Sequence, residues 1–593
     1  MINLIKILLL FSFVYMNELK NTNNYNLESM TLKDKIAQMI IVRINGEFYN
    51  TEHWRKKKVI SLIKNYNIGG IISYTGSIHG TYYNLKEFQE TSKIPLFVAA
   101  DYERGIGQFI DGTLFPSNMA VSATGNPDNA FEQGKITAIE AKSIGVNMVF
   151  APVLDINNNL NNPIINFRSY GDNPETVSKY SLPYIEGVQS QNIIACGKHF
   201  PGHGDTNTDS HTSLPIIDKS IEELFNNELR PFKDACDNKV RSIMIAHILF
   251  PELDSDNPAT LSKKITTDIL REKWKYEGLI ITDALEMGAL TSHTWHGEAA
   301  VKAIEAGADI ILLPIDVEIA INSIYNAVIE NRITEERINE SVNRIMLEKE
   351  RIGILDKVYT TWDNVEKNVK IKEHTKTAQK IANESITLVK DSDNLIPLNV
   401  RKSKHITHIM LSTDEDVKSR FKSYSREIKR VHGNVEEIVV NEKLTKFGIK
   451  DILSKVKKTD LVIISMLIRI SMDKGLSTIH ATHNELLKKI NKIGIPTIGI
   501  SFGSPYLPEY SYLDTYLCTY GYGSISLDAT TDALFGRKNI TGKLPVDLNK
   551  VYKKGHGLTI KKNENIFEST LNIDLPESFS IINNAISDSV FPG

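Results

Sequence analysis

Short runs of apolar, mostly β-branched residues recur along the first half of the chain, and the stretches between them are long enough for a helix. This alternation is typical of parallel βα units and not of antiparallel hairpins. There are eight such runs, at residues 38–44, 68–74, 95–101, 146–156, 193–200, 242–248, 278–284 and 309–315. Eight repeats in one domain predict a closed (β/α)₈ TIM barrel of the α/β class.

Helical periodicity fills several of the gaps, at residues 123–144, 219–239, 259–274 and 334–350. The pattern changes near residue 375 to a smaller α/β unit, which begins with the apolar segment ANESITLVK. A chain of 593 residues exceeds the roughly 250–300 residues at which a single core stops growing. We therefore predict a barrel at 28–354, a linker at 355–376, an αβα sandwich domain at 377–550 and a tail at 551–593.

Polar residues interrupt the apolar runs mainly where the predicted strands end. Barrel enzymes carry their chemistry at the C-terminal ends of the strands and in the loops that follow. The residues concerned are Asp101 at the end of strand three, Arg168 in the loop after strand four, Lys198 and His199 at the end of strand five, His247 at the end of strand six and Asp283 at the end of strand seven. Any one of them could serve only to cap a strand end, but their common position predicts an active site on one rim.

The segment from Lys198 to Pro215, KHFPGHGDTNTDSHTSLP, combines glycines, prolines and small polar residues and is predicted to be a loop. Within it, Asp209 and His211 stand two residues apart. At this spacing the carboxylate can accept a hydrogen bond from imidazole Nδ1 and stabilise the imidazolium, which leaves Nε2 free to transfer a proton. We interpret the pair as a general acid/base.

A proton donor of this kind contributes roughly 10²–10⁴-fold to a reaction rate. Glycoside hydrolysis also needs a carboxylate on the other side of the anomeric carbon, and Asp283 at its strand end is placed to supply it. The usual rule based on the separation of two carboxyl groups does not apply, because one partner is a histidine.

Imidazoles and carboxylates in the same loop also raise the possibility of a metal site. Its ligands would be drawn from His199, His203, Asp205, Asp209 and His211. The spacing matches no standard zinc pattern, so no metal and no cofactor are expected. His203 has a simpler interpretation as a residue that holds the loop by hydrogen bonds to the backbone.

With these motifs in place, the chain resembles glycoside hydrolase family 3, in particular the β-N-acetylglucosaminidases related to the cell-wall recycling enzyme. The segment KHFPGHGDTNTDSH resembles the loop of that branch, whose His/Asp dyad implies His211 and Asp209 as acid/base. The segment ITDALEM resembles the family's nucleophile motif and implies Asp283 as nucleophile. The resemblance extends over nearly the whole chain, and implies that the second domain is mainly structural.

By the same resemblance, Asp101, Arg168, Lys198 and His199 are implied to bind the sugar, and His247 is grouped with them. After Asp101 the sequence reads YERGIGQF where the recycling enzymes have a QEGGRVQR-like run, so the outer subsites are expected to differ. The last residues, INNAISDSVFPG, resemble the entrance to a β-lactamase-like domain that follows this pair in some Bacteroidetes proteins.

Composition narrows the class of ligand. The formal net charge is −3 and 41% of residues are hydrophobic, so no strong basic field favours nucleic acid, and a carbohydrate is the expected partner. The three cysteines are widely spaced and do not indicate a disulfide framework. Residues 1–20 resemble a signal peptide too short to span a membrane, which predicts export to the periplasm or cell envelope, and otherwise a cytoplasmic protein.

The predicted activity is exo-acting, retaining hydrolysis of terminal β-linked N-acetylglucosamine, with a peptidoglycan fragment as the expected substrate. Two other enzymes fit the same residues: a phosphorylase, because a histidine acid/base carries no negative charge to repel phosphate, and a broader β-glucosidase. A catalytically inactive sugar-binding or scaffold protein is the alternative from another class. Oligomeric state is not indicated by the sequence.

Overall fold

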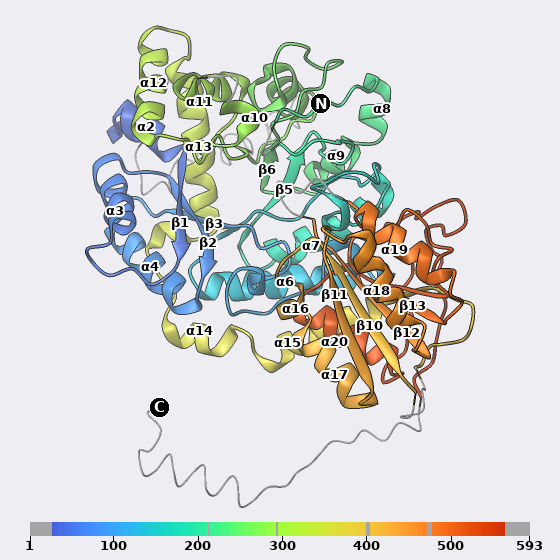
Figure 1. The fold of residues 1–593 in the computed structure, drawn as a ribbon. Coiled ribbons are helices and arrows are strands. Elements are labelled where there is room, and N and C mark those ends of the chain that lie inside the picture. Colours follow the sequence, from blue (N-terminus) through green and yellow to red (C-terminus); the bar gives the residue numbers. More distant parts are fainter. Residues whose placement is uncertain (1–26, 211–212, 292–294, 399–403, 471–476, 564–593) are drawn as a thin grey trace, which may run out of the picture.

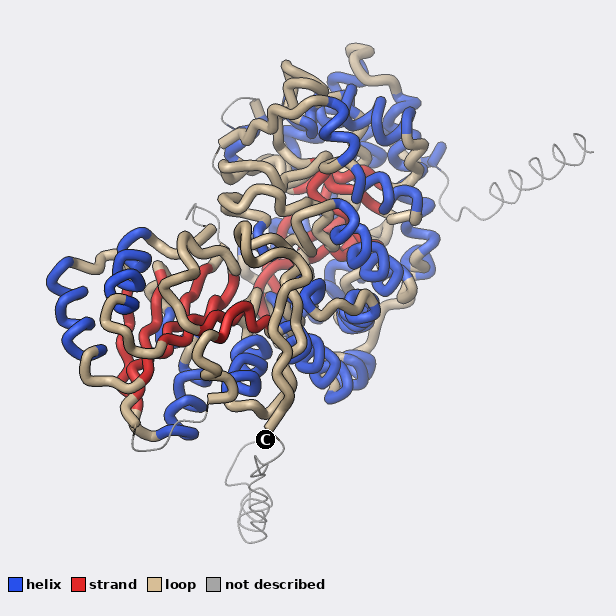
Figure 2. Tube along the Cα trace, turned by 90° about the vertical axis from the view of Figure 1, so that its right-hand side faces the viewer, coloured by secondary structure: helices blue, strands red, loops and turns tan. Residues whose placement is uncertain are grey.

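The computed structural model describes residues 27–210, 213–291, 295–398, 404–470 and 477–563. Three of the sequence predictions concern residues outside the described ranges: His211, the signal segment at 1–20, and the final residues that resemble a β-lactamase entrance. Two bodies lie side by side, a barrel and a smaller layered domain (Figures 1 and 2). Within the described residues, no helix has the length and apolar character needed to cross a membrane.

The predicted barrel is confirmed. Each strand is parallel to its neighbours, β1 pairs with both β2 and β8, and a bridge between Ile281 and Ile310 joins β7 to β8 and closes the ring. The strands are buried on both faces, which explains their nearly continuous apolar sequence. They are β1 (Ile40–Gly46), β2 (Gly70–Gly76), β3 (Phe97–Ala100), β4 (Met148–Val149), β5 (Ile194–Phe200), β6 (Ser242–Ile245), β7 (Leu279–Thr282) and β8 (Ile311–Leu312).

Helices cover the outside of the barrel (Figure 1). The long ones are α3 (Trp54–Tyr66), α4 (Ile78–Thr91), α6 (Asp128–Ser143), α7 (Pro174–Gln189), α11 (His296–Ala306), α12 (Val317–Ile329) and α13 (Glu335–Arg351). The predicted helix at 219–239 is two helices, α8 (Ile221–Asn226) and α9 (Arg230–Asp237). Pro231 explains the break, because it has no amide hydrogen and its ring would clash with the carbonyl of residue 227 in a continuous helix. Residues Lys264–Lys273 form a π-helix.

The second domain is a six-stranded sheet between two helical layers. Its order is β11-β10-β12-β13-β14-β9, and only β9 runs antiparallel. The strands are β9 (Thr387–Asp391), β10 (Ile406–Ser412), β11 (Val435–Val440), β12 (Leu461–Ile468), β13 (Thr497–Gly503) and β14 (Thr515–Cys518). One face packs on α15 (Lys372–Ser385), α17 (Lys422–His432) and α20 (Ser524–Leu534), the other on α18 (Lys446–Val456) and α19 (Ala481–Asn491).

The segments that join and follow these domains are also ordered. The predicted linker 355–376 contains α14 (Trp362–Asn368) and the start of α15. Beyond residue 551, Leu558 pairs with Leu388 and Ile560 with Ile540, so this part of the predicted tail packs on the second domain.

The two domains share one apolar cluster. Met119 and Phe167 of the barrel lie in the same core cluster as Tyr506, Tyr516 and other residues of the second domain. Several hydrogen bonds cross the boundary, among them Asn157 Nδ2 to Tyr506 Oη at 2.8 Å, Ser117 Oγ to the Tyr520 carbonyl at 2.6 Å, and the Asp547 amide to Asp172 at 2.7 Å. The second domain is thereby fixed against the rim of the barrel that carries Arg168.

Candidate active site

The C-terminal ends of the barrel strands gather the predicted polar residues on one rim. Asp101 directly follows β3, Lys198 and His199 lie in β5, and Asp283 directly follows β7. Asp101 and Asp283 are partly exposed, whereas Lys198 and His199 are buried. Two carboxylates therefore face the opening of the barrel above a buried layer of positively charged and imidazole groups.

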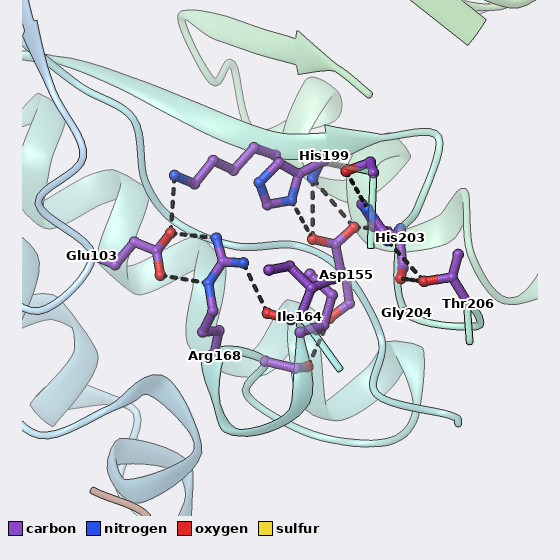
Figure 3. Close-up of polar contacts among 12 residues, drawn as sticks. Glu103, Asp155, Ile164, Arg168, His199, His203, Gly204 and Thr206 are labelled. Atoms are coloured by element: carbon purple, nitrogen blue, oxygen red, sulfur yellow. Dashed lines mark hydrogen bonds and ion pairs between the residues drawn. The ribbon is translucent and has the colours of Figure 1, made fainter. Parts of the chain in front are cut away.

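Lys198 is the centre of a buried charge network. Its Nζ lies 2.8 Å from Asp101 Oδ1 and 2.9 Å from Glu103 Oε1. Arg168 completes the network with a bidentate pair to Glu103, in which Nη2 is 2.7 Å from Oε1 and Nε is 3.1 Å from Oε2 (Figure 3). The Arg168 Nη1 donates to the Ile164 carbonyl at 2.9 Å, which fixes the plane of the guanidinium.

The network keeps Glu103, Lys198 and Arg168 charged. Burial opposes ionisation of Glu103, but the charges of Arg168 and Lys198 hold its pKa well below the usual value. Burial likewise disfavours the Lys198 ammonium, but Asp101 and Glu103 raise its pKa. Because the Asp101 side chain is 25% exposed while that of Lys198 is only 3% exposed, Asp101 is the member that can accept hydrogen bonds from a sugar.

Asp155 holds the start of the histidine loop. Its Oδ2 lies 2.7 Å from His199 Nδ1, and its Oδ1 accepts from the His203 amide at 2.6 Å. Asp155 is fully buried, which opposes ionisation, but the His199 imidazole and the His203 amide keep its pKa below the ordinary value. The peptide bond between Lys198 and His199 is cis. With Nδ1 bound to Asp155, His199 presents Nε2 as its remaining polar atom.

The histidine loop is tied down up to Ser210. His203 Nδ1 lies 3.0 Å from Thr206 Oγ1 and its Nε2 lies 3.0 Å from Ser210 Oγ. Burial lowers the pKa of His203 to about 4, so this ring is neutral near pH 7 and joins two hydroxyls. The sequence predicted hydrogen bonds from His203 to the backbone, whereas its ring partners are side chains.

Asp209 lies in the same loop, with a side chain that is largely buried. Its predicted partner His211 lies outside the described residues, so the dyad stays a prediction. No group of three histidine, cysteine, aspartate or glutamate side chains in the described part of the chain is arranged to hold a metal ion.

Asp283 is held by hydrogen bonds to backbone groups of β6 and of the next residue. Its amide donates to the Ile245 carbonyl at 2.9 Å, and the Ala284 amide donates to its Oδ1 at 2.8 Å. Tyr74, near the end of β2, lies within electrostatic reach of both Asp101 and Asp283: burial and the charge of Asp101 raise its pKa, and Asp283 adds to the effect. The two partly exposed carboxylates therefore both lie near the Tyr74 phenol.

His247 lies behind the rim. Its side chain is fully buried, with Nδ1 2.7 Å from Thr260 Oγ1 and Nε2 2.9 Å from the Ala284 carbonyl. This second bond connects it to the residue that follows Asp283. The geometry fits a residue that positions the Asp283 segment, and the direct sugar contact stays a prediction.

Sequence analysis did not single out Glu103, Asp155 or Tyr74. Each carried a usable signal: Glu103 stands two residues after Asp101, Asp155 is the polar residue near the end of the fourth apolar run, and Tyr74 ends the second run. All three belong to the same rim as the predicted residues.

A cavity of about 490 Å³ lies elsewhere, at the N-terminal end of the barrel. It is lined by residues that precede β4 and β5 and by the segment after α13, among them Lys142, Asn192 and Tyr359. None of the rim residues contributes to it. The chemistry of the barrel rim therefore does not use this cavity.

Comparison with known proteins agrees with this arrangement. The model of the glycosyl hydrolase family 3 N-terminal domain matches residues 31–347. A beta-hexosaminidase A of Pseudoalteromonas piscicida is 30% identical over 385 residues, which are 59% of this chain and 63% of that protein. The chain thus spans somewhat less than two thirds of that relative.

Two solved structures are similar over most of the chain. One is a glycoside hydrolase family 3 beta-N-acetylglucosaminidase from Paenibacillus sp. str. FPU-7, with a TM-score of 0.77 and 29% identity, covering 88% of this chain and 99% of that one. The other is the beta-glucoside phosphorylase BglX bound to 2FGlc, with a TM-score of 0.79 and 26% identity over 88% of this chain and 95% of that one. With a barrel, a rim of charged residues and a family model that matches more than half of its length, this chain belongs to glycoside hydrolase family 3.

Proposed function

We propose that this protein is a retaining, exo-acting β-N-acetylglucosaminidase. The observation that carries the proposal is the rim geometry: Asp101 and Asp283 face one opening, above a Lys198 that is held by two carboxylates. The similarity to a beta-hexosaminidase and to a beta-N-acetylglucosaminidase structure supports an N-acetylglucosaminide as substrate.

In the proposed first step, an Asp283 carboxylate oxygen bonds to the anomeric carbon while the bond to the leaving group breaks. His211 gives its proton to the departing oxygen, and Asp209 stabilises the imidazolium before this transfer. Asp101 accepts hydrogen bonds from sugar hydroxyls, and Lys198 and Arg168 keep the nearby carboxylates ionised and in place. The product is a glycosyl-enzyme ester on Asp283.

In the second step, His211 removes a proton from water, and the water oxygen replaces the Asp283 carboxylate at the anomeric carbon. Two displacements at one carbon restore the β configuration, so the released sugar has the configuration of the substrate. Asp155 supports both steps through His199, whose ring it orients toward the site.

The natural substrate that we propose is a peptidoglycan fragment with a terminal β-linked N-acetylglucosamine. With this substrate the protein would act in the periplasm or cell envelope, in agreement with the apolar N-terminal segment. The carbohydrate is proposed as the only ligand that the reaction needs.

The test is hydrolysis of an aryl β-N-acetylglucosaminide by the wild type, Asp283→Ala and His211→Ala. We expect the wild type to be active and insensitive to EDTA, and Asp283→Ala to be slower by several orders of magnitude. In His211→Ala the first step should recover most with aryl groups that leave without protonation, whereas the second step should stay slow because the base that deprotonates water is also missing. An inactive wild type would favour a sugar-binding protein, and activity lost with EDTA would favour a metal site.

A phosphorylase is a second candidate, favoured by the similarity to a beta-glucoside phosphorylase structure. In this case a phosphate oxygen, in place of water, would displace Asp283 from the anomeric carbon and give a sugar 1-phosphate. Product analysis with and without phosphate distinguishes the two reactions, and the rates on aryl glucoside and aryl N-acetylglucosaminide measure how broad the sugar specificity is.

A further inference from the structure

Loops at the carboxyl ends of the strands of the second domain lie against the barrel. Its chain passes from β10 to β11 on one side and then to β12 on the other side of β10. In open α/β sheets the loops at the carboxyl ends of such strands diverge and form a crevice in which ligands bind. Here Tyr522, in the loop after β14, approaches the barrel beside Phe167 and Arg104, and the residues that follow β10 and β12 meet it there.

Three arginines from different parts of the chain meet around Tyr522. The Arg104 guanidinium of the barrel lies 5.7 Å from the centre of the Tyr522 ring, and that of Arg420, at the end of α16 (Val417–Arg420), lies 6.0 Å from it. Arg469, directly after β12, lies close enough to Tyr522 for the two side chains to interact electrostatically. All four residues are partly exposed, whereas the Nε atoms of Arg420 and Arg469 are buried, so a ligand would meet the outer parts of these guanidinium groups.

Positive charge is in excess among these described residues. Asp414 is the acidic partner of two of the arginines, with Oδ2 3.2 Å from Arg469 Nη1 and 3.8 Å from Arg420 Nε. The Nε atoms of Arg420 and Arg469 are buried without a hydrogen-bond partner in the described part of the chain. For Arg104, the stacking on Tyr522 is the one side-chain interaction found among the described residues.

The arginines lie next to the sugar site. Arg104 directly follows Glu103, which holds Lys198 and Arg168. Phe167 directly precedes Arg168, and its ring lies 6.1 Å from that of Tyr522. The cluster therefore borders the residues of the proposed sugar site on the side of the second domain.

We propose that Arg104, Arg420 and Arg469 bind an anionic oxygen group, either a carboxylate on the leaving group of the substrate or a free phosphate ion. Guanidinium groups offer planar pairs of N–H donors that match both anions. The inference rests on the proposed glycosidase function, for which it defines the class of leaving group. It assigns the second domain a part in substrate recognition beyond the structural support expected from sequence.

The carboxylate is tested with two matched substrates, the 4-(carboxymethyl)phenyl and 4-(carbamoylmethyl)phenyl β-N-acetylglucosaminides. Their leaving groups differ in charge but little in size or acidity. We expect the wild type to favour the carboxylate in kcat/KM by about 10-fold, the size of effect usual for one close charge pair. Arg104→Met and Arg469→Met should bring this ratio close to one.

Arg230→Met is the matched control, because Arg230 forms an exposed ion pair with Glu175 on the outside of the barrel. It should keep the ratio of the wild type. Arginines that only join the two domains would change both substrates equally and would lower the melting temperature, so an unchanged ratio in Arg104→Met and Arg469→Met overturns the carboxylate as ligand.

The phosphate source is tested by product analysis in the presence of inorganic phosphate. Formation of N-acetylglucosamine 1-phosphate by the wild type, and its loss in Arg104→Met and Arg469→Met, assigns the cluster to phosphate. Hydrolysis of both substrates at equal kcat/KM without any sugar phosphate overturns the anion site and leaves the proposed glycosidase function intact.

If the wild type cleaves neither substrate, the proposed glycosidase function is refuted. The anion site can still be tested by measuring the binding of the anions directly. Calorimetric titration of the wild type and Arg469→Met with inorganic phosphate and with the carboxymethylphenyl glycoside supplies that measurement. Weaker binding of either anion to Arg469→Met supports the site, and equal binding to both proteins overturns it.

Discussion

At the scale of single residues, Glu103 has two buried cations to neutralise, Lys198 and Arg168. Glu103→Gln keeps the shape of the side chain but leaves these cations with less compensation. Breaking a buried ion pair in this way costs about 3–5 kcal/mol of folding free energy. We expect a loss of this size in denaturant unfolding, together with a large fall in kcat/KM, because Lys198 is then held by Asp101 alone.

Glu175→Gln is the control for this substitution. Glu175 pairs with Arg230, but both side chains are at least half exposed, and such pairs contribute about 0–1 kcal/mol. Equal stabilities of the two variants would show that Glu103 does not carry the buried network.

Asp155 acts on the site through His199. In Asp155→Asn the charge is lost and the side-chain amide competes as a donor, so the His199 ring is no longer held in one orientation. Partners of this kind change activity by about 10–100-fold, and we expect kcat/KM to fall by that factor while the fold remains. Steady-state kinetics with a melting curve checks this, and an Asp155→Asn protein as active as the wild type would contradict it.

Sequence alone placed Asp101, Lys198 and Asp283 on one rim, because the carboxyl ends of parallel barrel strands must meet at one face. It did not identify Glu103 or Asp155. Their importance depends on burial and on partners that are distant in the chain, such as Arg168 for Glu103, 65 residues apart. Spacing within one loop holds no information on contacts of this range.

At the scale of elements, α13 carries a buried lysine against the strands at the bottom of the barrel. Lys349 Nζ donates to Gln38 Oε1 at 2.7 Å and to the Gly69 carbonyl at 3.1 Å. Burial lowers the pKa of Lys349 to about 7, well below that of the same lysine in the unfolded chain. The unfolded state therefore binds one more proton than the folded state between about pH 7 and pH 10.

This difference gives a prediction with a definite sign. The free energy of unfolding should rise with pH from about 7 to 10, because over that range folded Lys349 is neutral and unfolding requires the uptake of a proton that becomes scarcer. The rise is about 2–4 kcal/mol. Lys349→Met should be less stable at every pH, since it leaves two acceptors unpaired, but should lack this part of the slope. Urea titrations at several pH values provide the comparison, and parallel curves for both proteins would contradict it.

The positions of the barrel elements were largely predictable, but their extents were not. The fourth apolar run covers residues 146–156, yet β4 contains only Met148–Val149. Pro152 follows closely and has no amide hydrogen for a ladder, so the regular strand ends, although Val153 still forms a parallel bridge with Lys198 before the chain delivers Asp155 to the site. Apolar character predicted burial correctly here, but not the length of the regular strand.

At the scale of the whole molecule, the contact between the domains was beyond prediction from sequence. Periodicity indicates which residues are buried but not whether the partner lies in the same domain. Phe167 and Met119 belong to the barrel segment, yet both pack in a cluster made mostly by the second domain. The consequence is that Arg168 is supported from both sides, by Glu103 in the barrel and, through Phe167, by Tyr522.

Because this cluster spans the boundary, we expect the two domains to unfold together. Phe167→Ala removes a buried aromatic ring, which costs about 3–5 kcal/mol. In scanning calorimetry the wild type should show one transition, and Phe167→Ala either a single transition at lower temperature or two separate ones. Activity should fall as well, because Arg168 follows Phe167 in sequence. Phe447→Ala is the control, since that ring is 81% exposed and its loss should change neither property. Two independent transitions already in the wild type would mean that the shared cluster does not couple the domains, and Arg168 would then depend on the barrel alone.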